Sequence, residues 1–104
     1  MNISEKSRYK LKFANPVFHK GLNTTIRCGK RLGNLPEVQG LFEIEGSQKR
    51  GRVVHKQVYF LEDLPLWVLE REHNPDCRSV DDLLDALGQP KMTDEVTVVG
   101  FYLE

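Results

Sequence analysis

The chain has 104 residues, of which 39% are hydrophobic and 29% charged, and its formal net charge at neutral pH is zero. This length suits one core, so we expect residues 1–104 to form a single domain. No apolar run approaches the roughly 20 residues of a membrane span, and the polar start MNISEKSRYK does not resemble a secretory signal, so we expect no membrane partner and a cytoplasmic location.

The zero net charge conceals a division along the chain. Residues 1–60 carry 12 Lys and Arg against four acids, a net charge of +8, whereas residues 61–104 carry three against 11, a net charge of −8. A basic half that formed one continuous face would attract a phosphate backbone, whereas a fold that interleaved the two halves would neutralise it. The sequence leaves both arrangements open.

The first elements are short. Residues 8–13 alternate between basic and apolar side chains, which predicts a strand with one buried and one basic face. Asn15 and Pro16 predict the start of a short helix that ends at Gly21, because Asn caps free amides and Pro is tolerated at the first helical position. Residues 23–27 (NTTIR) predict the next strand.

Three further strands follow from β-branched and aromatic runs. Residues 38–45 and 52–60 predict a pair of strands joined around the basic turn GSQKRG. Residues 95–103 (EVTVVGFYL) predict a final strand, in which Gly100 indicates a bulge or a close backbone approach.

Between these strands the apolar period changes from two to about 3.6. Asp63 is the expected cap of a short helix with the body LWVLERE, and Ser79 is the expected cap of a second helix that ends at Gly88. Five strands, an early helix and a later helical pair predict an α+β domain, arranged as a small curled sheet or barrel.

The order of these elements and several motifs resemble the ASCH domain family, whose fold is a PUA-like β-barrel. The likeness runs from about Tyr9 to Glu104 and rests on Thr25-Ile26-Arg27, LEDLPLWVLEREH, SVDDLLDAL and DEVTVVGFYLE. It implies that RNA or a modified nucleoside binds in a cleft beside the barrel. Some relatives of nearly this length are acetylcytidine amidohydrolases, which use a Lys, a Thr and a Glu near the Thr-Ile-Arg strand.

The resemblance assigns roles residue by residue. Thr25 and Arg27 match the family's Thr and Arg, and the family's acid falls at Asp76 or, with a shift of a few residues, at Glu72. Either carboxylate could instead be a solvated loop residue that balances a nearby Arg, and for Glu72 we favour that interpretation. The family's Lys falls at Leu22, which cannot move a proton or stabilise an oxyanion. The candidate catalytic residues are therefore Thr25, Asp76, Glu72 and, as the nearest replacement for the missing Lys, Lys20.

Arg27 is the strongest candidate for ligand binding, because its planar fork suits a carboxylate of its own fold, a phosphate or a base edge. The candidate ligand-binding residues are Thr25, Arg27, Lys30, Arg31, Arg50 and Arg52. The histidines and the two isolated cysteines lack the spacing of a metal site, so we expect no metal and no cofactor.

Leu22 favours recognition of RNA or a modified nucleoside over catalysis. Hydrolysis of an acylated pyrimidine nucleoside such as acetylcytidine is the alternative, so whether the chain is an enzyme stays open, as does its oligomeric state.

Overall fold

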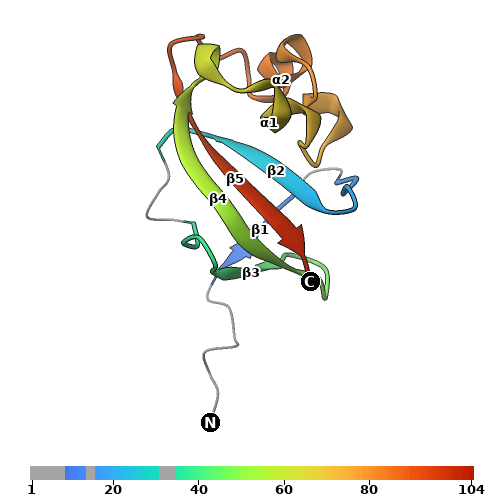
Figure 1. The fold of residues 1–104 in the computed structure, drawn as a ribbon. Coiled ribbons are helices and arrows are strands. Elements are labelled where there is room, and N and C mark those ends of the chain that lie inside the picture. The colour runs from blue at the N-terminus through green and yellow to red at the C-terminus, as the bar shows by residue number, and fades with distance from the viewer. Residues whose placement is uncertain (1–8, 14–15, 31–34) are drawn as a thin grey trace.

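The computed structural model describes residues 9–13, 16–30 and 35–104 and has an α+β architecture (Figure 1). Its strands are β1 (Lys10–Leu11), β2 (Leu22–Cys28), β3 (Leu41–Ile44), β4 (Arg50–Phe60) and β5 (Glu95–Leu103). Two helices, α1 (Leu66–Glu70) and α2 (Val80–Ala86), lie between β4 and β5 in the chain, and each follows a short 3-10 turn. The predicted helical pair and the five predicted strands are thus confirmed, with shifted ends.

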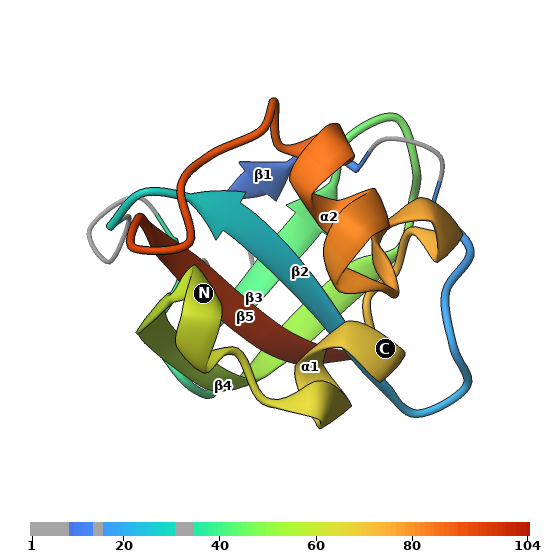
Figure 2. The ribbon, with the colours of Figure 1, turned by 90° about the horizontal axis from the view of Figure 1, so that it is seen from above.

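The strands form one mixed sheet in the order β1-β3-β4-β5-β2. β1 and β3 are parallel, and all other neighbours are antiparallel. β1 and β2 end the sheet and do not pair with each other within the described residues, so the sheet is open there and does not close into the predicted barrel (Figure 2).

The predicted helix from Asn15 to Gly21 is wrong. Asn15 lies outside the described residues, and the segment from Pro16 onward has no helical turn before Gly21. Two of its amides have other partners: the Val17 N–H donates to the His73 carbonyl at 2.8 Å, and the His19 N–H donates to the side-chain oxygen of Asn23, four residues later, at 2.6 Å. One tertiary hydrogen bond and one local bond to a side chain have therefore replaced the helical ones that the local signals predicted.

The core lies on both faces of the sheet. Alternation along β5 directs Val96 and Val98 to the face covered by the helices, and Val99 and Phe101 to the opposite face. The helix-side cluster contains Ile26, Leu61, Val68, Leu69, Cys77, Leu83, Val96 and Val98. The opposite cluster contains Leu11, Leu35, Phe42, Ile44, Val53, Val99 and Phe101. β5 is thus buried on both faces, which explains its nearly continuous apolar sequence.

Two glycines allow close packing within the sheet. A Cβ atom at Gly51 would lie 2.3 Å from the Phe42 ring, so the ring occupies the space that any other side chain would need. The register between β4 and β5 shifts between Val53 and His55, opposite Gly100, and a Cβ atom at Gly100 would lie 3.0 Å from that of His55. The bulge or close approach predicted for Gly100 is therefore confirmed.

Of the two helix caps predicted from the sequence, one is confirmed and one is wrong. The Ser79 hydroxyl accepts the Asp82 N–H at 3.2 Å and caps α2 as predicted. Asp63 does not cap α1, because it belongs to the preceding 3-10 turn and Pro65 occupies the N-cap position.

The sheet order settles how the charged halves are arranged. β5, from the acidic half, lies between β4 and β2 from the basic half, so the two halves interleave. Exposed acids nevertheless gather on the helices and the turns around them, at Glu62, Asp63, Glu70, Asp76, Asp81, Asp82, Asp85 and Asp94. The helical layer is therefore acidic, and β5 contributes little charge between the basic strands.

Candidate functional site

The free edge of β2 is covered by a short segment that follows α1. The Thr24 N–H donates to the Arg71 carbonyl at 2.7 Å, and the His73 N–H donates to the Thr24 carbonyl at 2.9 Å. The Thr24 hydroxyl also donates to the Val68 carbonyl at 2.6 Å. An exposed strand edge can pair with strands of other chains. Here hydrogen bonds within the chain satisfy the backbone groups of the β2 edge at Thr24.

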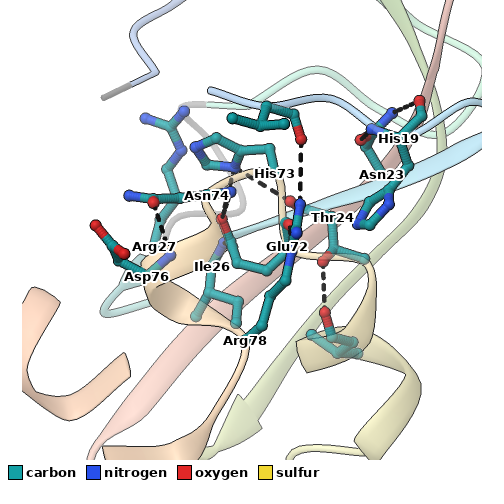
Figure 3. A network of polar contacts seen from close by, with 12 residues as sticks. His19, Asn23, Thr24, Ile26, Arg27, Glu72, His73, Asn74, Asp76 and Arg78 are labelled. Carbon is teal, nitrogen blue, oxygen red and sulfur yellow. Dashed lines mark hydrogen bonds and ion pairs between the residues drawn. The ribbon is translucent and has the colours of Figure 1, made fainter. Parts of the chain in front are cut away.

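The side chain of Glu72 covers the next part of the β2 edge, and the residue is only 1% exposed. One carboxylate oxygen accepts the Ile26 N–H at 3.0 Å, and the other accepts the Asn74 N–H at 3.1 Å and lies 2.6 Å from His73 Nδ1 (Figure 3). All three partners are donors, so each carboxylate oxygen accepts at least one hydrogen bond. The interpretation of Glu72 as a solvated loop residue is therefore wrong: it stands in for a backbone partner of β2.

His73 was not singled out by the sequence, yet it is the side chain that Glu72 holds. Its Nδ1 faces both the Glu72 carboxylate and the Thr24 carbonyl, the latter at 3.2 Å, so Nδ1 carries a proton. The ring packs edge-on against Phe13, with 4.7 Å between centroids. The histidine is 7% exposed, and both its orientation and its tautomer are fixed.

Arg27 lies on the same side of β2 as Thr25, since alternate residues of a strand share a face. Its Nη2 donates to the Lys12 carbonyl at 2.8 Å, and its guanidinium carbon lies 5.2 Å from the centroid of the Phe13 ring. Arg27 and His73 therefore pack on the same aromatic ring, which connects β2 to the segment that covers its edge.

These groups line one open cleft of about 360 Å³. Its described lining comprises Lys12, Thr25, Ile26, Arg27, Cys28, Glu72, His73, Asn74, Cys77, Ala86 and Leu87. Thr25 is 2% exposed, and its hydroxyl forms no hydrogen bond that the described part of the chain provides. The structure thus brings together Thr25, Arg27 and Glu72 from the predicted site.

The other catalytic candidates lie outside the lining of this cleft. Asp76 is exposed, and its N–H donates to the Asn74 side-chain oxygen at 2.9 Å, which closes a turn (Figure 3). Lys20 is exposed in the bend before β2. Leu22 lies three residues before Thr25 in β2, and residues three apart on a regular strand lie on opposite faces. A lysine at position 22 would therefore lie on the face of β2 opposite to Thr25.

The remaining basic candidates do not gather around the cleft. Lys30 is exposed beyond the end of β2, and Arg31 lies outside the described residues. Arg52 forms an ion pair of 2.8 Å with Glu104 and donates to the Gln39 carbonyl at 2.9 Å. Arg50 and Arg52 start β4 at the end of the sheet where Leu22 lies, so the basic hairpin is at the opposite end of β2 from Arg27.

Cys77 borders the cleft as a neutral thiol. Burial, followed by the nearby charges of Glu72, Asp76 and Asp82, raises the pKa of this thiol to about 11. A thiol with such a pKa is almost fully protonated at neutral pH and is a poor nucleophile. Cys77 therefore contributes apolar surface to the cleft wall.

Comparison with family models, curated proteins and solved structures finds no match to the chain. Within the described residues, no helix is long and apolar enough to cross a membrane, and no group of three or more His, Cys, Asp or Glu side chains is placed to hold a metal ion.

Proposed function

We propose that the chain is an ASCH-type binding module whose cleft holds a modified nucleoside. The observation that carries the proposal is the convergence of Thr25, Arg27 and Glu72 on one cleft. These are positions at which the resemblance to ASCH domains places functional side chains. The cytoplasmic location expected from the sequence belongs to the same proposal.

The size and surroundings of the cleft favour a nucleoside over an RNA strand. Its volume of about 360 Å³ lies at the lower end of the range of small-ligand sites, roughly 300–1,000 Å³. RNA recognition by a small domain usually needs a basic path that follows several phosphates. Here Arg50 and Arg52 lie at the far end of β2 from Arg27, so the described basic side chains form no continuous path from the cleft.

The cleft offers the kinds of contact that a nucleobase needs. Thr25 supplies a hydroxyl, and Arg27, which also donates to the Lys12 carbonyl, supplies a planar guanidinium to the same cleft. Leu87 and the thiol of Cys77 supply apolar surface for the ring. The described lining therefore combines apolar surface with polar groups that can fix the orientation of a ligand, as specific small-molecule sites do.

An amide-resolved NMR titration tests this proposal. Uridine, cytidine, acetylcytidine and a short single-stranded RNA would be added separately to the ¹⁵N-labelled chain. We expect saturable shifts at Thr25, Arg27 and Asn74 with at least one nucleoside. The proposal is rejected if no nucleoside binds at millimolar concentration, or if only the RNA binds and its shifts map to the β3–β4 hairpin.

Arg27→Lys provides the matched variant. It keeps the charge but loses the fork, so we expect nucleoside affinity to fall by about 10-fold, the effect of one good hydrogen bond. Arg52→Lys makes the same chemical change at the other end of the sheet and should leave affinity unchanged. Equal losses in both variants would mean that the effect is not local to the cleft.

Hydrolysis of an acylated pyrimidine nucleoside is a second candidate, favoured by the Glu72–His73 pair. Glu72 fixes His73 through Nδ1, as the orienting carboxylate does in a Ser–His–Asp triad, and Thr25 lines the same cleft. Binding remains the better supported proposal, because Leu22 provides no substitute for the family's Lys. Release of acetate from acetylcytidine by the parent chain but not by Thr25→Ala would reverse that order.

A further inference from the structure

A second, smaller hollow lies in the helical layer, and we call it the helical pocket. Its described lining includes Leu64 and Leu69 from the segment around α1, Val80 and Leu84 from α2, and Met92 from the turn before β5. Its volume is about 80 Å³, and its described lining shares no residue with that of the cleft beside β2. The helical pocket is therefore separate from the candidate nucleoside site.

Several apolar side chains at the helical pocket are exposed. Val80 is 45% exposed and Met92 is 39% exposed, although both line the pocket. Leu66 is 68% exposed and lies three residues before Leu69, so the two side chains are neighbours on one side of α1. Single exposed apolar residues are normal on a protein surface, whereas a group of them with a polar rim is typical of an interaction site.

The segments that form the helical pocket are strongly acidic. Residues 61–70 and 79–94 carry seven acids and a single base, Lys91. The acids are Glu62, Asp63, Glu70, Asp81, Asp82, Asp85 and Asp94, and all seven are exposed. Within the described part of the chain, none of them forms an ion pair. A surface with this excess of one charge attracts partners of the opposite charge.

Helix stability explains only part of this acidic charge. Asp81 and Asp82 lie in the first turn of α2, where the helix dipole favours acids. Asp85 lies near the C-terminal end of the same helix, where the dipole favours bases, and it accepts a hydrogen bond from the Gln89 side chain. Glu62 lines the helical pocket itself. The dipole of α2 therefore accounts for Asp81 and Asp82 but not for Asp85 or Glu62.

From these observations we infer that the helical pocket is a docking site for a basic peptide segment of a partner protein. The segment inserts one aliphatic side chain into the pocket and places Lys or Arg against the acidic rim. An apolar cavity of about 150 Å³ holds benzene, so the helical pocket suits a smaller group, such as the branched end of Leu, Ile or Val. The basic residues complement the charge of the rim, which disfavours a nucleic acid as the occupant. The inference does not depend on the proposed function, because it uses no residue of the cleft.

Amide-resolved NMR titrations with three synthetic peptides test the inference. The first peptide has a central leucine between two pairs of Lys and Arg, the second has serine in place of the leucine, and the third has Glu in place of the four bases. In low salt we expect the first peptide to shift the amides of Val80, Leu84 and Met92. It should bind at least about 10-fold more tightly than the serine peptide, which is the effect of burying one aliphatic side chain.

The acidic peptide should not bind. Equal binding of the leucine and serine peptides would overturn the inference, because the pocket would then hold no anchor. Equal binding of the basic and acidic peptides would also overturn it, because the charge of the rim would then have no effect. Shifts that mapped away from the helical pocket, or no binding by any peptide at millimolar concentration, would overturn it as well.

Two variants separate the anchor from the charge. Val80→Thr keeps the side-chain shape but adds a hydroxyl, so it should weaken the leucine peptide several-fold and leave the serine peptide unchanged. Val54→Thr makes the same change at an exposed position of β4 outside the pocket and should have no effect. Glu62→Gln should weaken both basic peptides, whereas Glu45→Gln, at the exposed β3–β4 turn, should weaken neither. Equal effects of each variant and its control would overturn the inference.

Sedimentation of the chain alone tests a second copy as the occupant, because the basic half of this chain could supply the same chemistry. We expect a monomer at the concentrations of the titration. A dimer whose formation shifted the amides of Val80, Leu84 and Met92 would overturn the inference in favour of self-association.

Discussion

Replacing Glu72 with glutamine tests how the free edge of β2 is held. Glutamine has nearly the same shape but exchanges one acceptor oxygen for an NH₂ donor and removes the charge. One carboxylate oxygen accepts from Ile26, and the other accepts from Asn74 and His73. Whichever way the amide is turned, its NH₂ group faces at least one N–H donor, so a buried donor loses its partner.

The size of the effect follows from that loss. A hydrogen bond to a charged group contributes about 1.5–3 kcal/mol, and a buried donor without a partner costs about 1–3 kcal/mol. These values describe partly the same contact, so we expect the free energy of unfolding to fall by about 2–4 kcal/mol rather than by their sum. For a domain of this size each kcal/mol lowers the midpoint of thermal unfolding by roughly 4–8 °C.

Urea unfolding followed by circular dichroism measures this change in Glu72→Gln, with Glu70→Gln as the control. Glu70 is exposed on α1 and should give a change within about 0.5 kcal/mol of zero. Hydrogen exchange adds a local readout, because the Ile26 amide should exchange faster in Glu72→Gln than global unfolding explains. A loss no larger than in Glu70→Gln, with the Ile26 amide still protected, would refute the role assigned to the carboxylate.

Three further predictions concern the sheet, a helix cap and the thiols. Gly51→Ala should lower the free energy of unfolding by about 1–3 kcal/mol, because its methyl group would overlap the Phe42 ring; an unchanged urea midpoint would contradict the packing. Ser79→Ala should cost about 1 kcal/mol through loss of the helix cap, whereas Ser79→Asp should retain most of it in the same measurement. With a thiol reagent at pH 8, exposed Cys28 should react quickly and buried Cys77 slowly, since its pKa of about 11 leaves little thiolate; equal rates in the native chain would contradict this.

The sequence predicted the elements whose signals are local. The helix after Ser79 combines a cap, a 3.6-residue apolar period and a terminal glycine within one short segment. The cap and the glycine act as expected, and Leu83 is buried, whereas Val80 is 45% exposed. Strand alternation likewise places Thr25 and Arg27 on one face of β2. The helix expected before Gly21 failed because the amide of Val17 bonds to His73, a partner that no local pattern reveals.

The roles of Glu72 and His73 were even harder to predict from the sequence, because they too depend on partners that no local pattern reveals. Glu72 accepts from an amide 46 positions earlier in the chain, and the need for it arises only because β2 is an edge strand. Nothing in the letters around Glu72 distinguishes it from exposed Glu70 on the preceding turn. Recognising β2 as an edge strand would have been the useful signal. Its unpaired N–H groups must find acceptors elsewhere in the chain.

The central position of β5 has a consequence for how the chain folds. Of the five strands it is the last in sequence, yet both β4 and β2 bond to it, so neither can complete its ladder until β5 arrives. During synthesis, the earlier strands leave the ribosome with open edges, while the segment that will protect the other side of β2 is also still to come. Contacts of such long sequence separation slow folding and prolong exposure to aggregation. Refolding yield should therefore depend strongly on protein concentration, even though the finished sheet hides most of these edges.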